Sequence, residues 1–205
     1  MSTNLLIDPL SAAQPTVICD HFLQQLNQLL DKAHKSVDND QSLDNDQSLD
    51  NDQSVDNNKH AETQLLSSAL QPDMFALAQQ VATCSRFALR ICFPMANKKV
   101  PEVDIDESSI TGLQAGIADV RKLIAELPPT ALDELSQQTL SEQAGVADVD
   151  LPGDQFCYLY GLPNFFFHLN MVYAILRLKD VPVSKADYDG FHSYPEGFSF
   201  EYQSE

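Results

Sequence analysis

Basic residues and glycine are scarce in this chain, and each shortage excludes a class of function. Twelve lysines and arginines stand against 30 aspartates and glutamates, which gives a formal net charge of −18 over 205 residues. A surface of this sign repels phosphate backbones and anionic membranes, so we expect no nucleic-acid partner and no membrane partner. The seven glycines form neither a phosphate-cradling loop nor a G-x-S-x-G motif. Phosphoryl and nucleotide chemistry therefore lack their usual motifs.

Paired cysteines and long apolar runs are also missing. Cys19, Cys84, Cys92 and Cys157 form no C-x-x-C motif, and we expect four reduced, mostly buried thiols. The most apolar segment, Phe165 to Leu178, is interrupted by polar residues and is shorter than a bilayer requires. The start of the chain has neither the basic region nor the long apolar region of a secretion signal. These features together predict a cytoplasmic protein.

A six-residue phrase, D-N-D-Q-S-L, occurs three times between Asp38 and Val55, with valine ending the last copy. Its alternating aspartates are typical of an EF-hand loop, but Leu43 stands where that loop needs glycine and Leu49 where it needs glutamate. A solenoid is excluded because one apolar residue in six buries too little area. We interpret residues 38–57 as a low-complexity acidic insertion in a surface loop, partly ordered by local turns. Weak cation condensation on the insertion is the open alternative.

Outside the insertion, apolar residues recur every three or four positions, as they do in helices packed side by side. We predict helices over Pro15 to His34, from Pro72 to Pro94, from Ile110 to Leu127 and from Pro163 to about Lys179. The last of these is apolar almost all round, so we expect it to be buried between the others. Before it, alternating residues, glycine and aromatics predict extended segments or a small hairpin across Pro152-Gly153.

These elements predict an all-α fold class, a four-helix bundle with a long crossover and a short extended or hairpin segment before the fourth helix. We expect one domain over residues 1–190 that carries the insertion. Residues 191–205 are expected to form an acidic, aromatic C-terminal tail.

Two longer stretches carry more specific motifs, LQPDMFALAQQV (Leu70 to Val81) and LPNFFFHLNMVYAILRLKDVPVSKADYDG (Leu162 to Gly190). They resemble the signatures of a bacterial family known only as a domain of unknown function, which is grouped with the DinB/YfiT-like four-helix bundles. The resemblance covers about Thr16 to Gly190 without the repeat. It implies a crossover between the second and third helices and, often, a homodimer. Many members of the wider superfamily bind a divalent metal through one histidine of the second helix and an H-x-x-x-H of the fourth, and these include thiol-dependent transferases and hydrolases.

The chain departs from that metal-binding pattern. Asn164 and Val172 stand four residues before and after His168, and the second helix carries Gln79 and Gln80 at the candidate positions. Zinc needs three nitrogen, sulfur or carboxylate ligands, and one histidine with an asparagine is a poor version of that set. We therefore predict no metal and no other cofactor. In the alternative, zinc or nickel binds with His168 as the sole candidate ligand.

His168 is the sharpest candidate site residue, with Asp73 and Asn164 as its expected neighbours. In a catalytic interpretation, His168 is a general base or metal ligand in a pocket with Asn164, and Asp73 of another helix orients it. In a structural interpretation, a carboxylate or a backbone carbonyl satisfies the buried ring, Asp73 stabilises the start of the second helix, and Asn164 caps the fourth. We favour the structural interpretation, because one imidazole on an apolar helix needs only a hydrogen bond.

The predicted function follows from these residues. We expect a binding or assembly module without a metal, forming a homodimer through helix faces. Phe165, Phe166 and Phe167 cannot all face one way on a helix, so at least one should meet another helix or a second subunit. The alternative is an enzyme acting on a small-molecule ligand, a thiol-dependent transferase or hydrolase, with His168 as base or metal ligand and Asp73 and Asn164 in support.

Overall fold

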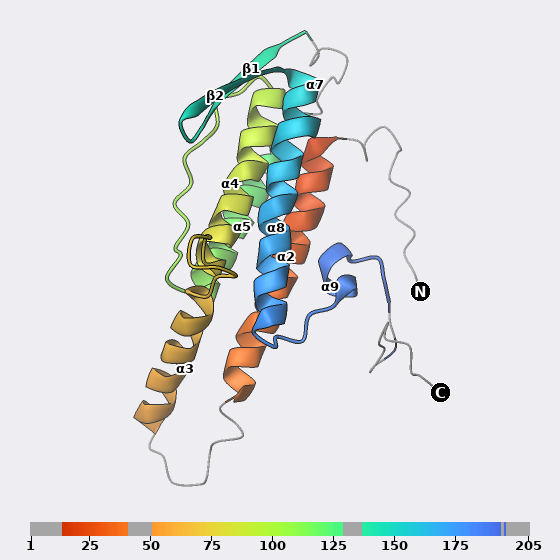
Figure 1. The fold of residues 1–205 in the computed structure, drawn as a ribbon. Helices are drawn as coiled ribbons and strands as arrows, with labels where there is room; N and C mark the ends of the chain where they lie inside the picture. The colour runs from red at the N-terminus through yellow and green to blue at the C-terminus, as the bar shows by residue number, and fades with distance from the viewer. Residues whose placement is uncertain (1–13, 41–50, 129–136, 194, 196–205) are drawn as a thin grey trace, which may run out of the picture.

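Four long helices of the computed structural model lie side by side and enclose the hydrophobic core (Figure 1). They are α2 (Pro15–Asp40), α4 (Leu77–Met95), α5 (Ile110–Ala125) and α8 (Leu162–Leu178). The structure describes residues 14–40, 51–128, 137–193 and 195. Helix α4 packs against the three other long helices, most extensively against α8. The predicted four-helix bundle is confirmed.

Helix α5 forms because its sequence supplies both a start signal and one buried face. The hydroxyl of Ser109 caps the helix by accepting a hydrogen bond from the Gly112 backbone N–H at 3.0 Å. Its apolar residues recur at intervals of three and four and are buried in the core. The crossover from α4 runs closely over this helix, and a Cβ at Gly116 would lie 2.8 Å from the Ile105 side chain. Glycine at this position lets the crossover pack onto α5.

The second predicted helix begins later than expected. Helix α4 starts at Leu77, and Pro72-Asp73 lie before it in a turn in which the Leu77 N–H donates to the Ser68 carbonyl at 2.8 Å. The Gln79 side chain instead caps the start of the helix by accepting from the Ala76 N–H at 3.1 Å. Asp73 is therefore not in the first turn of α4 and lies too far from it to stabilise its dipole in the expected way.

The acidic insertion is helical at both ends. Helix α2 runs to Asp40 instead of ending near His34, and a further helix, α3 (Asn51–Leu66), begins in the third copy of the repeat. The sequence did not predict α3, because one apolar residue in six marks no buried stripe. Two buried leucines at its end, Leu65 and Leu66, attach α3 to the core. Once a helix is nucleated, further turns cost little, so polar residues continue it where we expected local turns.

The expected hairpin is present, but its turn lies elsewhere. Strands β1 (Thr139–Ala144) and β2 (Ala147–Pro152) pair antiparallel, with Ala144 opposite Ala147. The turn is made at Gly145, whose φ of 64° is readily adopted only by glycine. Pro152 ends β2, and Gly153 begins the short helix α7 (Gly153–Gln155). The hairpin covers the end of the bundle where α4 ends and α8 begins (Figure 1).

Helix α8 continues from α7 through a π-helical segment, η1 (Phe156–Gly161). Its composition predicted a helix buried on all sides, but one side of α8 is exposed. Phe165 is fully buried, Phe166 packs edge-on against Phe22 of α2, and Phe167 remains 49% exposed. The three phenylalanines thus diverge as the helix pitch requires. Among the described residues, no helix combines the length and the apolar character needed to cross a bilayer.

The four cysteines are free thiols buried in the core, as expected. Burial raises the pKa of the Cys84 thiol far above its usual range. Burial and the nearby Cys92 raise the pKa of Cys157 to about 12. The thiols of Cys84 and Cys157 are therefore protonated and unreactive at neutral pH.

A short helix, α9 (Lys185–Asp189), follows α8 and lies against α2. Asp187 accepts hydrogen bonds from the backbone N–H of Ser184 at 2.7 Å and from its hydroxyl at 3.0 Å, which begins the helix. Gly190 ends it with a φ of 74°, and the Gln25 amide lies where a side chain would be. The predicted tail, residues 191–205, falls mostly outside the described residues.

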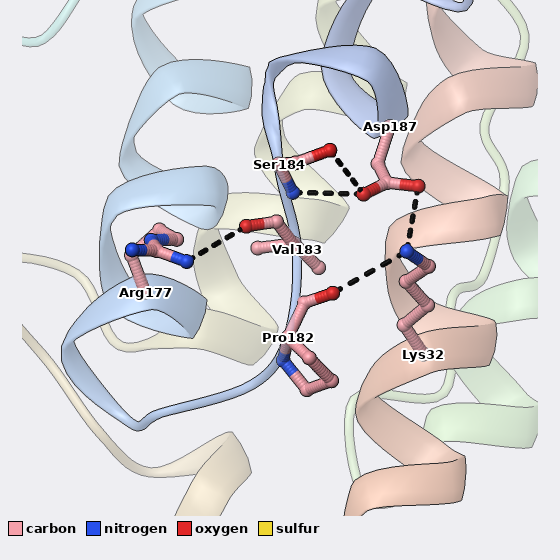
Figure 2. A network of polar contacts seen from close by, with 6 residues as sticks. All are labelled: Lys32, Arg177, Pro182, Val183, Ser184 and Asp187. Carbon is pink, nitrogen blue, oxygen red and sulfur yellow. Dashed lines mark hydrogen bonds and ion pairs between the residues drawn. The ribbon is translucent and has the colours of Figure 1, made fainter. Parts of the chain in front are cut away.

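Polar contacts join α9 and the segment before it to the bundle (Figure 2). The ammonium of Lys32 on α2 lies 2.8 Å from the Asp187 carboxylate and donates to the Pro182 carbonyl at 3.3 Å. Arg177 of α8 donates to the Val183 carbonyl at 3.0 Å. The segment after α8 is thus held by charged donors from two different helices.

Candidate functional site

His168 lies between α8 and α4, where it is 8% exposed. Its Nδ1 lies 2.7 Å from Oε1 of Gln80, a buried glutamine of α4. The amide nitrogen of Gln80 donates to the Phe75 carbonyl at 3.2 Å. Because a carbonyl can only accept, the amide oxygen of Gln80 must face the histidine, and the ring proton is assigned to Nδ1. In the neutral form of this ring, Nε2 is then the nitrogen that carries the lone pair.

Three aromatic rings surround this imidazole. Phe87 and Phe75 stack on it with centroid distances of 5.5 and 6.2 Å, and Phe167 meets it edge-on at 5.3 Å. The guanidinium of Arg90 lies 4.5 Å from the centre of the Phe87 ring. Burial, followed by the positive charge of Arg90, lowers the pKa of His168 to about 4. Such an imidazole is neutral at pH 7 and is a weak general base.

The other two predicted site residues do not complete a catalytic group. Asn164 precedes His168 by one helical turn, but its amide donates to the Tyr160 carbonyl at 2.7 Å and does not cap α8 as expected. The Tyr160 carbonyl belongs to η1, where the π-helix changes the pattern of backbone hydrogen bonds. The side-chain amide of Asn164 donates a hydrogen bond to this carbonyl. Asp73 is exposed in the turn before α4 and makes no hydrogen bond or ion pair with the described residues. The amide of Gln80, and not the carboxylate of Asp73, is the hydrogen-bond partner of the His168 ring.

The residues at this position do not fit a zinc or nickel site. The superfamily pattern places histidines here, whereas this chain has one imidazole, the carboxamide of Gln80 bonded to it, and the carboxamide of Asn164 one turn earlier on α8, bonded to the Tyr160 carbonyl. Zinc takes imidazole, thiolate or carboxylate ligands, and the Nδ1 of His168 is already hydrogen-bonded. Over residues 14–40, 51–128, 137–193 and 195, no three histidine, cysteine or acidic side chains are grouped to hold a metal ion. No chemical step through a metal follows from this arrangement.

The aromatic group is connected to the hairpin through Arg90. This guanidinium forms an ion pair with Glu142 of β1, and the Tyr160 hydroxyl donates to the same carboxylate at 3.1 Å. The carboxylate side chain of Glu142 is only 12% exposed. Nothing in the sequence signalled these residues, since their positions depend on how the hairpin folds over α4. Gln80 could have been paired with His168 by aligning the two antiparallel helices.

Comparisons with known proteins agree with the fold. Residues 46–189 match the family model described as a domain of unknown function, DUF1993. The crystal structure of a DinB family member protein from Shewanella denitrificans has a similar fold, with a TM-score of 0.64 and 24% sequence identity. The similarity covers 88% of this chain and 92% of that chain. The search of curated proteins finds no match.

The bounds of the family match differ from those expected at one end. It ends at Asp189, beside the expected Gly190, but it begins at residue 46 inside the repeat and not at Thr16. The third copy of the repeat therefore belongs to the family domain, in keeping with its place at the start of α3. Because the match spans more than half of the sequence, the chain belongs to the DUF1993 family, and its fold is that of the DinB-like bundles.

Proposed function

We propose that this protein is a binding or assembly module without a resident metal, and that two copies associate through the outer face of α8. The observation that carries the proposal is the nature of this face, which is apolar, exposed and free of acidic residues. The buried thiols and the negative surface support a cytoplasmic protein that binds neither nucleic acid nor membranes.

The outer face of α8 presents large apolar side chains to solvent. Phe167 is 49% exposed and Leu178 is 58% exposed, and Pro163 and Ala174 fall on the same side at helical spacing. Phe75, which like Phe167 contacts His168, extends the surface beyond α8 and is also 49% exposed. Large apolar side chains that are exposed along one face of a helix are typical of interaction sites.

The charge distribution favours a second copy of the chain as the partner on this face. Two molecules of net charge −18 repel each other over most of their surfaces. The 17 residues of α8 contain no aspartate or glutamate, and their single arginine, Arg177, donates to a backbone carbonyl. Two copies can therefore approach through this face with little repulsion between like charges. Their association would remove apolar surface of both copies from water.

The environment of His168 supports a structural role beneath this surface. Its hydrogen bond to Gln80 links α8 to α4, and its ring lies against Phe75 and Phe167. A pKa of about 4 is far from the value that suits a general base at neutral pH. These features favour a binding module over the alternative enzyme. In this module His168 holds the exposed rings of Phe75 and Phe167 in position.

The oligomeric state in solution tests the proposal. Sedimentation velocity on the whole chain should give a dimer at concentrations up to about 100 µM, the range of modest interfaces. Phe167→Glu should give a monomer, because it places a charge at the centre of the apolar face. Val146→Glu is the matched control, since Val146 is fully exposed at the hairpin turn and the charge change is the same. A monomeric wild type, or a Phe167→Glu variant that dimerises like the control, would refute the proposal.

A further inference from the structure

A hollow of about 490 Å³ lies at the hairpin end of the bundle, away from His168. Its walls come from α4, from the crossover at residues 100–103 and from β1. Leu89 and Phe156, which are 1% and 2% exposed, form its inner surface. A cavity of this size with a mostly apolar lining matches the usual form of a small-molecule site. No residue of α8 lines it, so it is separate from the proposed dimer face.

The arginines at the hollow already have acidic partners. Arg90 is paired with Glu142, whose carboxylate also accepts the Tyr160 hydroxyl. Arg86, one turn earlier on α4, lies 3.2 Å from Glu107. An anionic ligand would have to displace one of these carboxylates in a protein whose net charge repels it. The two guanidinium groups therefore do not make this an anion site.

Glu102 is the lining residue whose charge is not balanced. It is exposed on the crossover, and its carboxylate makes no hydrogen bond or ion pair with any residue of the described part of the chain. The hollow thus combines an apolar interior with one uncompensated negative charge at its rim. Burying apolar area in the interior contributes affinity, and the rim charge selects the sign of the ligand.

We propose that this cavity binds a hydrophobic monocation, an amine whose apolar body enters the hollow and whose ammonium group lies beside Glu102. The net charge of −18 favours the approach of such a ligand and disfavours an anionic one of equal size. Because the site shares no residue with the outer face of α8, binding does not depend on whether the protein dimerises.

A pair of fluorescent probes of opposite charge tests the sign of the ligand. We expect the cationic aminoacridine proflavine to bind the full chain saturably, with one molecule per protomer, in low-salt buffer. The anionic probe 8-anilinonaphthalene-1-sulfonate should bind at least tenfold more weakly. Tighter binding of the anion, or no saturable binding of proflavine, would overturn the proposal.

Two matched pairs of variants locate the site. Glu102→Gln should weaken proflavine binding about two- to fivefold, the effect of an exposed ion pair, whereas Asp104→Asn, which removes the same charge two residues away, should not. Leu140→Trp should fill the hollow and reduce affinity at least tenfold. Leu151→Trp is its control, because Leu151 is paired with Leu140 across the hairpin but does not line the hollow.

If Leu140→Trp fails to fold, the comparison of Glu102→Gln with Asp104→Asn decides the outcome, because Glu102 and Asp104 are both exposed and their replacement does not disturb the core. Equal weakening by Glu102→Gln and Asp104→Asn would indicate only general attraction of cations and would overturn the site. Unchanged binding in a folded Leu140→Trp variant would do the same. Phe167→Glu should bind proflavine like the wild type, so failure of the dimer proposal and failure of this one are distinguishable.

Discussion

The Nδ1 of His168 and the Oε1 of Gln80 lie 2.7 Å apart, and this hydrogen bond joins α8 to α4. It occupies the position at which the resemblance to DinB-like bundles predicted metal-binding histidines on the second and fourth helices. A glutamine cannot replace a histidine as a zinc ligand, but its amide satisfies a buried imidazole. In this chain a hydrogen bond therefore connects the two helices at the position where that resemblance implied a metal.

Removal of the Gln80 side chain tests the strength of this connection. Gln80→Ala leaves the Nδ1–H of His168 without a partner in a buried position, so the free energy of unfolding should fall by about 1–3 kcal/mol. Gln79→Ala is the control, since Gln79 is exposed and its side chain only caps the start of α4. Urea denaturation of both variants measures the difference. A loss no larger for Gln80→Ala than for Gln79→Ala would contradict the structural role.

The depressed pKa of His168 predicts a specific pH dependence of stability. Because the folded-state pKa of about 4 lies below the unfolded value of 6.5, the unfolded chain binds the proton first as the pH falls. The contribution of the neutral ring is complete above pH 6.5 and is lost between pH 6.5 and 4, to a total of about 3 kcal/mol. Urea titrations of wild type and His168→Gln across this range should converge as the pH falls, because the acidic residues are common to both. A constant difference between the two would show that the ring does not titrate in this way.

The sequence carried enough information for the bundle, because its main helices mark their buried faces with regular apolar spacing. In α5 the leucines, isoleucines and valine predicted both the helix and the face that the structure buries. Helix α3 could not be predicted in the same way, since its sequence is polar and, among the side chains described at residues 57–66, the buried ones are Leu65 and Leu66 at one end. The start of α4 was also misjudged, because a proline and an acid suit a turn as well as the beginning of a helix.

The candidate site was predictable only in part. The apolar helix around His168 indicated a buried ring, and the structure places the ring there. Its partner was expected to be a carboxylate or a backbone carbonyl, and it is a side-chain amide, because the register of α4 against α8 decides which residue faces the histidine. The hollow beside Glu102 had no sequence signal, since four separate segments, α4, the crossover, β1 and η1, line it.

The contacts of Lys32 predict how firmly α9 is held (Figure 2). Burial alone would raise the pKa of Asp187, but hydrogen bonds from Lys32 and Ser184 outweigh it and lower that pKa. Lys32→Met should therefore free the helix locally, with faster amide hydrogen exchange in residues 185–190 and a loss of about 1 kcal/mol or less in global stability. Lys35→Met removes the same charge from an exposed position three residues away and should leave the exchange unchanged. Equal exchange in the two variants would mean that the ion pair does not hold α9.

Deletion of one copy of the repeat tests whether its length matters to the fold. Removing residues 41–46 shortens the connection between α2 and α3 by six residues and leaves both described helices intact. Loop-closure entropy changes slowly with length, so shortening the ten-residue connection to four should change the free energy of unfolding by only about 0.8 kcal/mol. Leu66→Ala is the comparison variant, because Leu66 is buried in the core. Its replacement should lower the free energy of unfolding by about 2–3 kcal/mol. If the deletion costs as much as Leu66→Ala in the same urea titration, the repeat contributes packing of its own and is not a tolerated insertion.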